Sequence, residues 1–405
     1  MALAVGLTAI VGCGEEVAIY DQPPFRRDPA PIGRLNGRFV TSNSYDDSMS
    51  IVDPSGSAPG ARLPVGLSPV ELEGPHHVAV DPAGRAVYVN LSLSVASSAS
   101  GPHGSHGTGQ MPGYVLKLDT RDGKVIGRVQ VDANPGDNLL SADGKTLFVS
   151  HYDLVRWVHA SHGEDPRAGD SSLIAIDTEK MIVRRRVPIC PAAHGLRQSA
   201  DGATLYVACG PDEIAVVDLR PSAWSVRRVP LPGLKEDINC RRCPYGLGVA
   251  PDGTVWVASL GTSAGRGGVD VFDPRAGDGG AFDPARSITV GGSAMFPEFA
   301  AVPGGFRVVL AEQGLAGDFV HIYDPTGPGQ PPRSLSSWPL SPQQCLNVHM
   351  LVLSRDARRA HLVCEGDHRG PGRVAWLDLE SGVVSASVAV GVFPDALAWV
   401  PEVSP

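Results

Sequence analysis

Charged and aromatic side chains are scarce in this sequence of 405 residues. Asp, Glu, Lys and Arg make up 19% of it, Phe, Trp and Tyr make up 6%, and the formal net charge is -9. The chain therefore offers no strongly basic surface of the kind that binds nucleic acid, and nucleic acid is excluded as a predicted partner. The apolar fraction of 42%, spread along the chain, excludes an intrinsically disordered protein.

The apolar segment at the N-terminus is too short to cross a bilayer. It reads MALAVGLTAIVG and ends at Cys13, whereas a membrane-spanning helix needs about 20 apolar residues. The segment instead fits the core of a signal peptide, although the basic residues that usually precede such a core are missing.

The tetrad IVGC, which ends at Cys13, resembles the bacterial lipobox, in which the cysteine is lipidated and becomes the new N-terminus. The resemblance implies a signal segment over residues 1–13. Residues 14–34 are rich in proline and would then form a tether. The lipid would hold the protein on a membrane, in the periplasm or at the cell surface. A leader with an incidental cysteine is the alternative.

Glycine and proline are abundant, with 48 and 36 residues, which suits short strands joined by tight turns. The segment PYGLGVAPDG at residues 244–253 returns every 40 to 60 residues in related forms: PHHVAVDPAG, PGDNLLSADG, AHGLRQSADG, PEFAAVPGG, VHMLVLSRDA and PDALAWVP. A unit of this length cannot bury its own apolar face, so the copies must stack on one another. We therefore expect one repeat domain over residues 35–405.

Each repeat is predicted to form four strands. In the fourth copy, HGLRQSA is followed by the pair Asp201 and Gly202, then by ATLYVAC, IAVVDL and the return strand SVRRVPL. Asp-Gly is a favoured hairpin turn, so the copy predicts an antiparallel meander, and radial repetition of such sheets gives a β-propeller. The last segment, FPDALAWVP, is an innermost strand without followers. The fold class is therefore all-β: a seven-bladed β-propeller of four-stranded antiparallel blades, closed by the C-terminal strand completing blade one.

The stretch PYGLGVAPDGTVWVASLG, followed by VDVFD, resembles the YVTN-type seven-bladed propeller repeat of exported bacterial and archaeal proteins. The resemblance covers nearly all of the chain after the leader and implies the same fold. It says little about function, because propellers host binding modules, lactonases, lyases and metal or quinone enzymes. We expect a monomer.

Aligning the seven copies predicts a ring of polar side chains around the axis. The second position of each copy is Gly136 in one blade and a polar residue in the others: His76, His194, Tyr245, Glu298, His349 and Asp395. This position lies where each innermost strand begins, on a face of the disc that we term the top face. Every histidine except His321 and His361 maps to this face, and His151 is expected just behind the ring.

Three interpretations of this ring remain open. Imidazole and carboxylate together suit one transition-metal ion (Cu, Zn, Fe or Mn), and a ring of inward side chains can leave a coordination position open. The same residues could instead bind a small molecule or peptide without a metal, or line a channel filled with water. The ligands would come from different blades, so no short motif decides among these interpretations.

Seven cysteines in an exported chain predict disulfides. With Cys13 set aside, the simplest pairing joins cysteines that are 19 residues apart at matching positions of two repeats, Cys190 with Cys209 and Cys345 with Cys364. Cys240 and Cys243 are then left to each other or to a metal. The alternative is that the paired cysteines are soft-metal ligands.

Counting around the hairpin turns gives an expected register at the top of two blades. Cys209 is expected opposite His194, and Cys364 opposite His349. In the third blade the equivalent position is His151. The cysteine pairs would then lie directly behind the ring.

The sequence favours a binding module: a lipid-anchored extracytoplasmic propeller that presents its top face to a small-molecule or protein ligand. No Ser-His-Asp arrangement or phosphate loop can be recognised, and no general base stands out, so the sequence does not decide whether the protein is an enzyme. One alternative is a metal-dependent lyase or hydrolase, which would resemble the way streptogramin lyases and nitrous oxide reductase place histidines at a propeller hub. Another is a metal-trafficking protein.

Overall fold

The computed structural model describes residues 34–67, 72–93, 108–109, 111–161, 166–220, 222–233, 240–262, 265–314 and 316–403. The predicted signal segment with its Cys13 lies outside these residues, as does the predicted tether except for Arg34. In the described part of the chain, no helix is long and apolar enough to cross a membrane.

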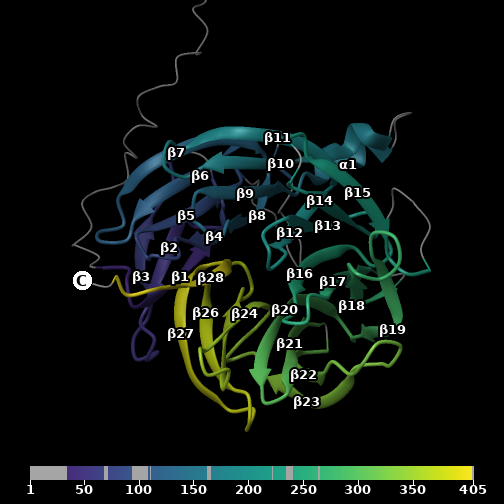
Figure 1. Ribbon diagram of the computed structural model, residues 1–405. Helices are drawn as coiled ribbons and strands as arrows, with labels where there is room; N and C mark the ends of the chain where they lie inside the picture. The colour runs from purple at the N-terminus through teal and green to yellow at the C-terminus, as the bar shows by residue number, and fades with distance from the viewer. Residues whose placement is uncertain are drawn as a thin grey trace, which may run out of the picture.

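The strands form seven four-stranded antiparallel sheets, arranged as blades around a central axis (Figure 1). The predicted fold is therefore confirmed. Blade one contains β28 (Pro394–Val400), β1 (Arg38–Asn43), β2 (Ser48–Val52) and β3 (Ala61–Pro64). Blade two contains β4 (Pro75–Val80), β5 (Ala86–Leu91), β6 (Pro112–Asp119) and β7 (Val125–Ala133). Blade three contains β8 (Pro135–Leu140), β9 (Thr146–His151), β10 (Asp170–Asp177) and β11 (Ile182–Pro191).

The remaining four blades follow in chain order. Blade four contains β12 (Ala193–Gln198), β13 (Thr204–Cys209), β14 (Glu213–Asp218) and β15 (Ser225–Pro230). Blade five contains β16 (Pro244–Val249), β17 (Val255–Thr262), β18 (Gly265–Asp273) and β19 (Ala281–Thr289). Blade six contains β20 (Ser293–Val302), β21 (Gly305–Gln313), β22 (Asp318–Asp324) and β23 (Arg333–Leu340). Blade seven contains β24 (Val348–Leu353), β25 (Arg359–Cys364), β26 (Pro371–Asp378) and β27 (Val384–Val392).

Two short helices interrupt the chain between β9 and β10 in blade three. They are α1 (Leu154–Ser161) and the 3-10 helix η2 (Pro166–Gly169). Trp157 of α1 lies close against Gly210, where an added Cβ would meet the indole ring at 2.7 Å. The helix therefore packs onto the top of blade four.

The two ends of the chain close the ring. β28 pairs with β1, with Phe39 opposite Trp399 and Val40 opposite Ala398, so the last strand becomes the innermost strand of blade one. In Figure 1 the labels of β28 and β1 lie side by side. The pairing of β28 with β1 covers an edge of the blade-one sheet that would otherwise be exposed.

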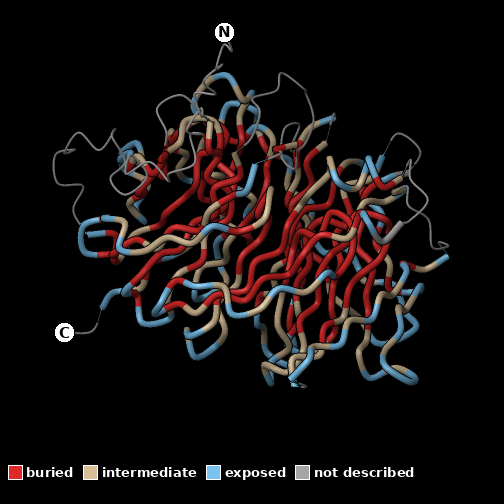
Figure 2. Tube along the Cα trace, turned by 90° about the horizontal axis from the view of Figure 1, so that it is seen from above, coloured by how far each residue is buried: buried red, intermediate tan, exposed pale blue. Residues whose placement is uncertain are grey.

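The hydrophobic core lies between neighbouring blades. Leu173 of β10 in blade three belongs to the same buried cluster as Leu205 and Val207 of β13 in blade four. Figure 2 shows this burial in the interior of the disc, with the exposed residues at its margins. Full burial of each such side chain stabilises the fold by about 1.5–3 kcal/mol, so the blades hold one another in place.

Each innermost strand begins with a β-bulge. The register shifts near the first paired residue of all seven strands, and in six blades the residue before the bulge has a positive φ. These residues are Gly74, Asn134, Ala192, Cys243, Asn347 and Phe393. A bulge adds a residue to one strand and re-aims its side chains. Consecutive side chains at the start of these strands can therefore face the axis.

The bulges correct the predicted register by one residue. Ala193, not His194, lies opposite Cys209, and Val348, not His349, lies opposite Cys364. The two histidines fall on the extra residue of the bulge, which a count around the hairpin turn does not include. His151 lies opposite Pro135, so the three blades remain equivalent.

Three disulfides form: two join the predicted pairs, and the third joins the two cysteines that the sequence left to each other or to a metal. They link Cys190 to Cys209, Cys345 to Cys364 and Cys240 to Cys243. The first two fasten the segment that enters a blade to the end of its second strand. These six cysteines, the ones among the described residues, therefore offer no thiolates to a soft metal, and the disulfides are typical of an oxidising compartment.

Candidate functional site

The first bulge position of each blade lies at the start of its innermost strand, at the top face. The residues at this position are His76, Gly136, His194, Tyr245, Met295, His349 and Asp395. Five of the predicted residues therefore occupy equivalent positions, and the sixth does not. The exception is Glu298, whose place is taken by Met295.

Glu298 lies three residues further along its strand than the alignment predicted. β20 has 10 residues where β16 has 6, and its hairpin is tighter, with Val302 opposite Gly305. Pro244 of β16 and Pro297 of β20, which the alignment treats as equivalent, therefore lie at different positions in their strands. Glu298 pairs with Val309 in the body of the sheet, where burial raises the pKa of its carboxyl group.

The second bulge position adds two functional groups that the sequence analysis missed. His77 follows His76, and Asp137 follows Gly136. His77 Nδ1 lies 2.8 Å from Asp137 Oδ1, and the other oxygen of Asp137 lies 2.6 Å from Nη1 of Arg197. The doublet of histidines was visible in the sequence, but a regular strand would turn the second one away from the axis.

Four imidazoles at the axis share one orientation. Each has Nδ1 against an oxygen that can only accept. The acceptors are Pro135 O at 3.4 Å for His76, Asp137 Oδ1 at 2.8 Å for His77, Tyr245 O at 3.3 Å for His194 and Glu365 Oε1 at 2.7 Å for His349. Nδ1 of His77 and of His194 therefore carries the proton and Nε2 keeps a lone pair, whereas Nε2 of His76 and of His349 faces a carboxylate oxygen of Asp395.

These Nε2 atoms and one carboxylate gather in a small volume. Asp395 Oδ2 lies 3.0 Å from Nε2 of His76, and Oδ1 lies 3.0 Å from Nε2 of His349. Two groups of three possible metal ligands occur, and the ligand atoms within each group lie within 4.8 Å of one another: His76, His77 and His194, and His77, His349 and Asp395. His77 belongs to both groups, so it lies at the centre of the cluster.

The cluster is almost completely removed from solvent. His77 is 3% exposed and His194 is 0% exposed, and Nε2 of both rings is buried with no hydrogen-bond partner among the described residues. Burial lowers the pKa of both imidazoles, and that of His194 falls well below 6.5. Both rings are therefore neutral at pH 7 and able to donate a lone pair.

Charged neighbours oppose the effect of burial on the pKa values of His349 and Asp137. Burial alone would lower the pKa of His349, but Asp395 and Glu365 together raise it. Burial disfavours the ionised form of Asp137, yet His77 and Arg197 hold its pKa far below the usual range. Asp137 is thus a charged group that orients His77.

Aromatic rings form one wall of the cluster. The ring of Tyr245 stacks on that of His194 with a centroid distance of 3.7 Å. Tyr152 meets both rings edge-on, at 5.1 Å from His194 and 5.7 Å from Tyr245. Phe296, at the second bulge position of blade six, lies 5.4 Å from His77. This wall fixes the ring planes and separates the donors from water.

His151 lies apart from the cluster. Its Nδ1 is 2.8 Å from Ser172 O, and it belongs to neither group of donors. Its Nε2 is buried without a hydrogen-bond partner among the described residues. Burial lowers its pKa to about 4, so the ring is neutral at pH 7.

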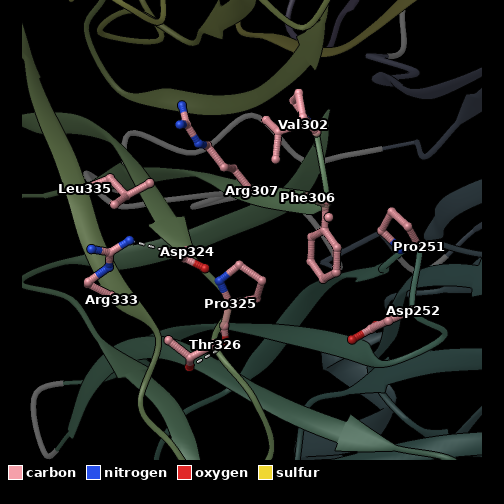
Figure 3. Close-up of a pocket in the computed structure, with 13 residues that line it drawn as sticks. Pro251, Asp252, Val302, Phe306, Arg307, Asp324, Pro325, Thr326, Arg333 and Leu335 are labelled. Atoms are coloured by element: carbon pink, nitrogen blue, oxygen red, sulfur yellow. Dashed lines mark hydrogen bonds and ion pairs between the residues drawn. The ribbon is translucent and has the colours of Figure 1, made fainter.

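An open pocket of about 700 Å³ lies elsewhere, at the turns of blades five and six (Figure 3). Its walls include Pro251, Phe306 and Arg307, and also Arg333, which pairs with Asp324 of the neighbouring strand at 2.7 Å. None of its lining residues was predicted as a site residue, and none belongs to the axial cluster.

The sequence matches no protein family and no curated protein. Solved structures are similar in fold. The periplasmic gluconolactonase of Pseudomonas aeruginosa is 18% identical over 90% of this chain and 98% of its own, with a TM-score of 0.60. A Bacteroides uniformis protein provisionally named a 6-phosphogluconolactonase is 13% identical over 89% and 98%, with a TM-score of 0.61. A Desulfotomaculum acetoxidans protein of unknown function is 10% identical over 91% and 100%, with a TM-score of 0.65. At these identities the likeness shows the fold alone.

The lowered pKa of His151 predicts a loss of stability in acid. The unfolded chain takes up this proton near pH 6.5 and the folded protein near pH 4, so stability falls as the pH drops between these values. The loss reaches about 3 kcal/mol. The free energy of unfolding, measured in denaturant with EDTA at pH 7 and pH 4, should fall by that much more in the wild type than in His151→Gln. Equal losses in both proteins would contradict the assignment.

Proposed function

We propose that this protein binds one transition-metal ion on the propeller axis. The observation that carries the proposal is a buried cluster of four imidazoles, each with Nδ1 against an acceptor oxygen, whose members fall with Asp395 into two groups of possible metal ligands. Buried polar atoms normally have partners. An ion at the centre of the cluster would satisfy Nε2 of His77 and His194, which have none among the described residues.

The donor atoms suit a transition-metal ion that is intermediate between hard and soft. Neutral imidazole suits Zn, Cu and Fe, and a carboxylate extends the set towards Mn. Metal-binding histidines usually donate their other ring proton to a carboxylate or a carbonyl. Asp137 and Glu365 stand in that relation to His77 and His349.

The burial of the donors supports retention of the ion. His76, His194, His349 and Asp395 are each at most 2% exposed, so water has little access to compete for the metal. The proposal is thus a metal-binding propeller outside the cytoplasm, a compartment that the three disulfides favour. The ion would be a resident ligand of the buried axis.

Metal content tests this proposal. The purified wild-type protein, reloaded with Zn or Cu and dialysed, should hold about one equivalent per chain. The variant His77→Gln should hold much less, because His77 belongs to both groups of donors. His321→Ala is a matched control, since this imidazole pairs with Glu312 in blade six, away from the axis.

Elemental analysis after size exclusion gives the readout, and thermal unfolding checks that each variant folds. A wild-type protein that holds no metal after reloading would contradict the proposal. Equal metal content in the wild type and in His77→Gln would contradict the assigned site.

Hydrolysis of a sugar lactone is a second candidate function. Two structures of similar fold carry lactonase names, and a metal ion can polarise a carbonyl or activate water. The metal-loaded protein should then open a gluconolactone faster than buffer does, and His77→Gln should not. A proton-release assay measures this, and a rate equal to that of buffer would contradict the candidate.

Lipid anchoring at Cys13 is part of the proposed location. The expectation rests on the lipobox-like sequence before this cysteine. Expressed in a bacterium that lipidates exported proteins, the full chain should fractionate with the membrane, and Cys13→Ser should release it. An unchanged membrane fraction for Cys13→Ser would count against the anchor.

A further inference from the structure

The buried axial cluster has two branches that lead away from the axis. Each branch starts at a histidine of the cluster and continues to a carboxylate. One runs from His77 to Asp137, and the other from His349 to Glu365. An ion that reaches the axis must pass the shell of side chains around it, and the two branches differ in what they offer a cation.

The branch through Asp137 ends at a positive charge. Arg197 lies 2.6 Å from Asp137 Oδ2 and is the partly exposed end of that branch, with 24% of its side chain accessible. A fixed guanidinium repels a metal ion at short range. This branch therefore orients His77 without admitting an ion.

The branch through Glu365 ends at a further donor. Glu365 Oε2 lies 2.7 Å from Nε2 of His368, while its Oε1 lies 2.7 Å from Nδ1 of His349. His349 in turn lies 3.0 Å from Asp395. The side chains of His349, Glu365 and Asp395 are 0% exposed, whereas that of His368 is 10% exposed. Imidazole and carboxylate donors thus alternate without a break from the surface to the axis.

The surface end of this branch is held in place. His368 has a φ of 60°, a left-handed conformation that is uncommon for a residue with a side chain. Its ring stacks on Phe393 with a centroid distance of 3.9 Å and meets Tyr45 edge-on at 5.9 Å. Strained backbone that is fixed by its surroundings tends to gather at functional positions.

We propose that Glu365 and His368 form an outer docking site for the metal ion, from which it passes to the axis by way of His349 and Asp395. The inference rests on the proposed function and adds the route of loading to it. The outer site would take a divalent cation from solution or from a carrier. It holds two donors, and the axis holds a larger set within 4.8 Å, so the ion moves towards the tighter site.

Stopped-flow mixing of the metal-free full chain with Co²⁺ tests the route, because Co²⁺ bound by imidazole and carboxylate develops visible bands. The variant His368→Gly removes the imidazole and adopts a φ of 60° without strain. Its uptake should be about tenfold slower than in the wild type, while the equilibrium dissociation constant stays unchanged. His159→Ala, which removes an exposed histidine of α1, should match the wild type.

Each other outcome has a distinct meaning. Unchanged uptake in His368→Gly, with binding intact, would overturn the route and leave the axial site standing. A loss of rate and affinity by the same factor would also overturn it, because His368 would then stabilise the loaded site. Absence of Co²⁺ bands in the wild type would refute the proposed function itself. His368→Asn, which tolerates the same backbone conformation, repeats the test if the glycine variant does not fold.

Discussion

The bulge at the start of each innermost strand is the constraint on which the site depends. A regular strand turns alternate side chains to opposite faces, so only one of His76 and His77 could then point to the axis. The extra residue lets both do so, and it places Asp137 beside them in the next blade. Because the bulge is repeated around the ring, imidazole and carboxylate groups from four different blades meet at the axis.

Burying these polar groups at the axis costs free energy. A buried polar group without a hydrogen bond costs about 1–3 kcal/mol, and at the axis the Nε2 atoms of His77 and His194 lack one among the described residues. Asp137, Glu365 and Asp395 offset part of the cost of the imidazoles by accepting or facing their ring nitrogens. The arrangement is therefore unfavourable as a purely structural core and favourable as a site that gains a ligand.

The sequence predicted the fold well and the site in part, for reasons that lie in particular residues. Turns such as Asp201 and Gly202 indicated four-stranded antiparallel blades. The C-terminal strand has no strands after it in the sequence, so it had to complete blade one and close the ring of seven. His76, His194 and His349 lie at equivalent positions, as the alignment assumed, because their innermost strands all have six residues. Glu298 was misplaced because β20 is longer than β16 and turns more tightly, and repeat alignment assumes equal strands. His77, Asp137 and Glu365 were missed because bulges and contacts between blades leave no local pattern.

The most direct test of the account is a crystal structure of the metal-loaded protein with anomalous data collected at the absorption edge of the metal. The account predicts one anomalous peak on the axis, at about 2.0–2.2 Å from Nε2 of His77 and of at least one further histidine of the cluster. A single ordinary water at this position after loading, or a metal bound only elsewhere on the molecule, would contradict it.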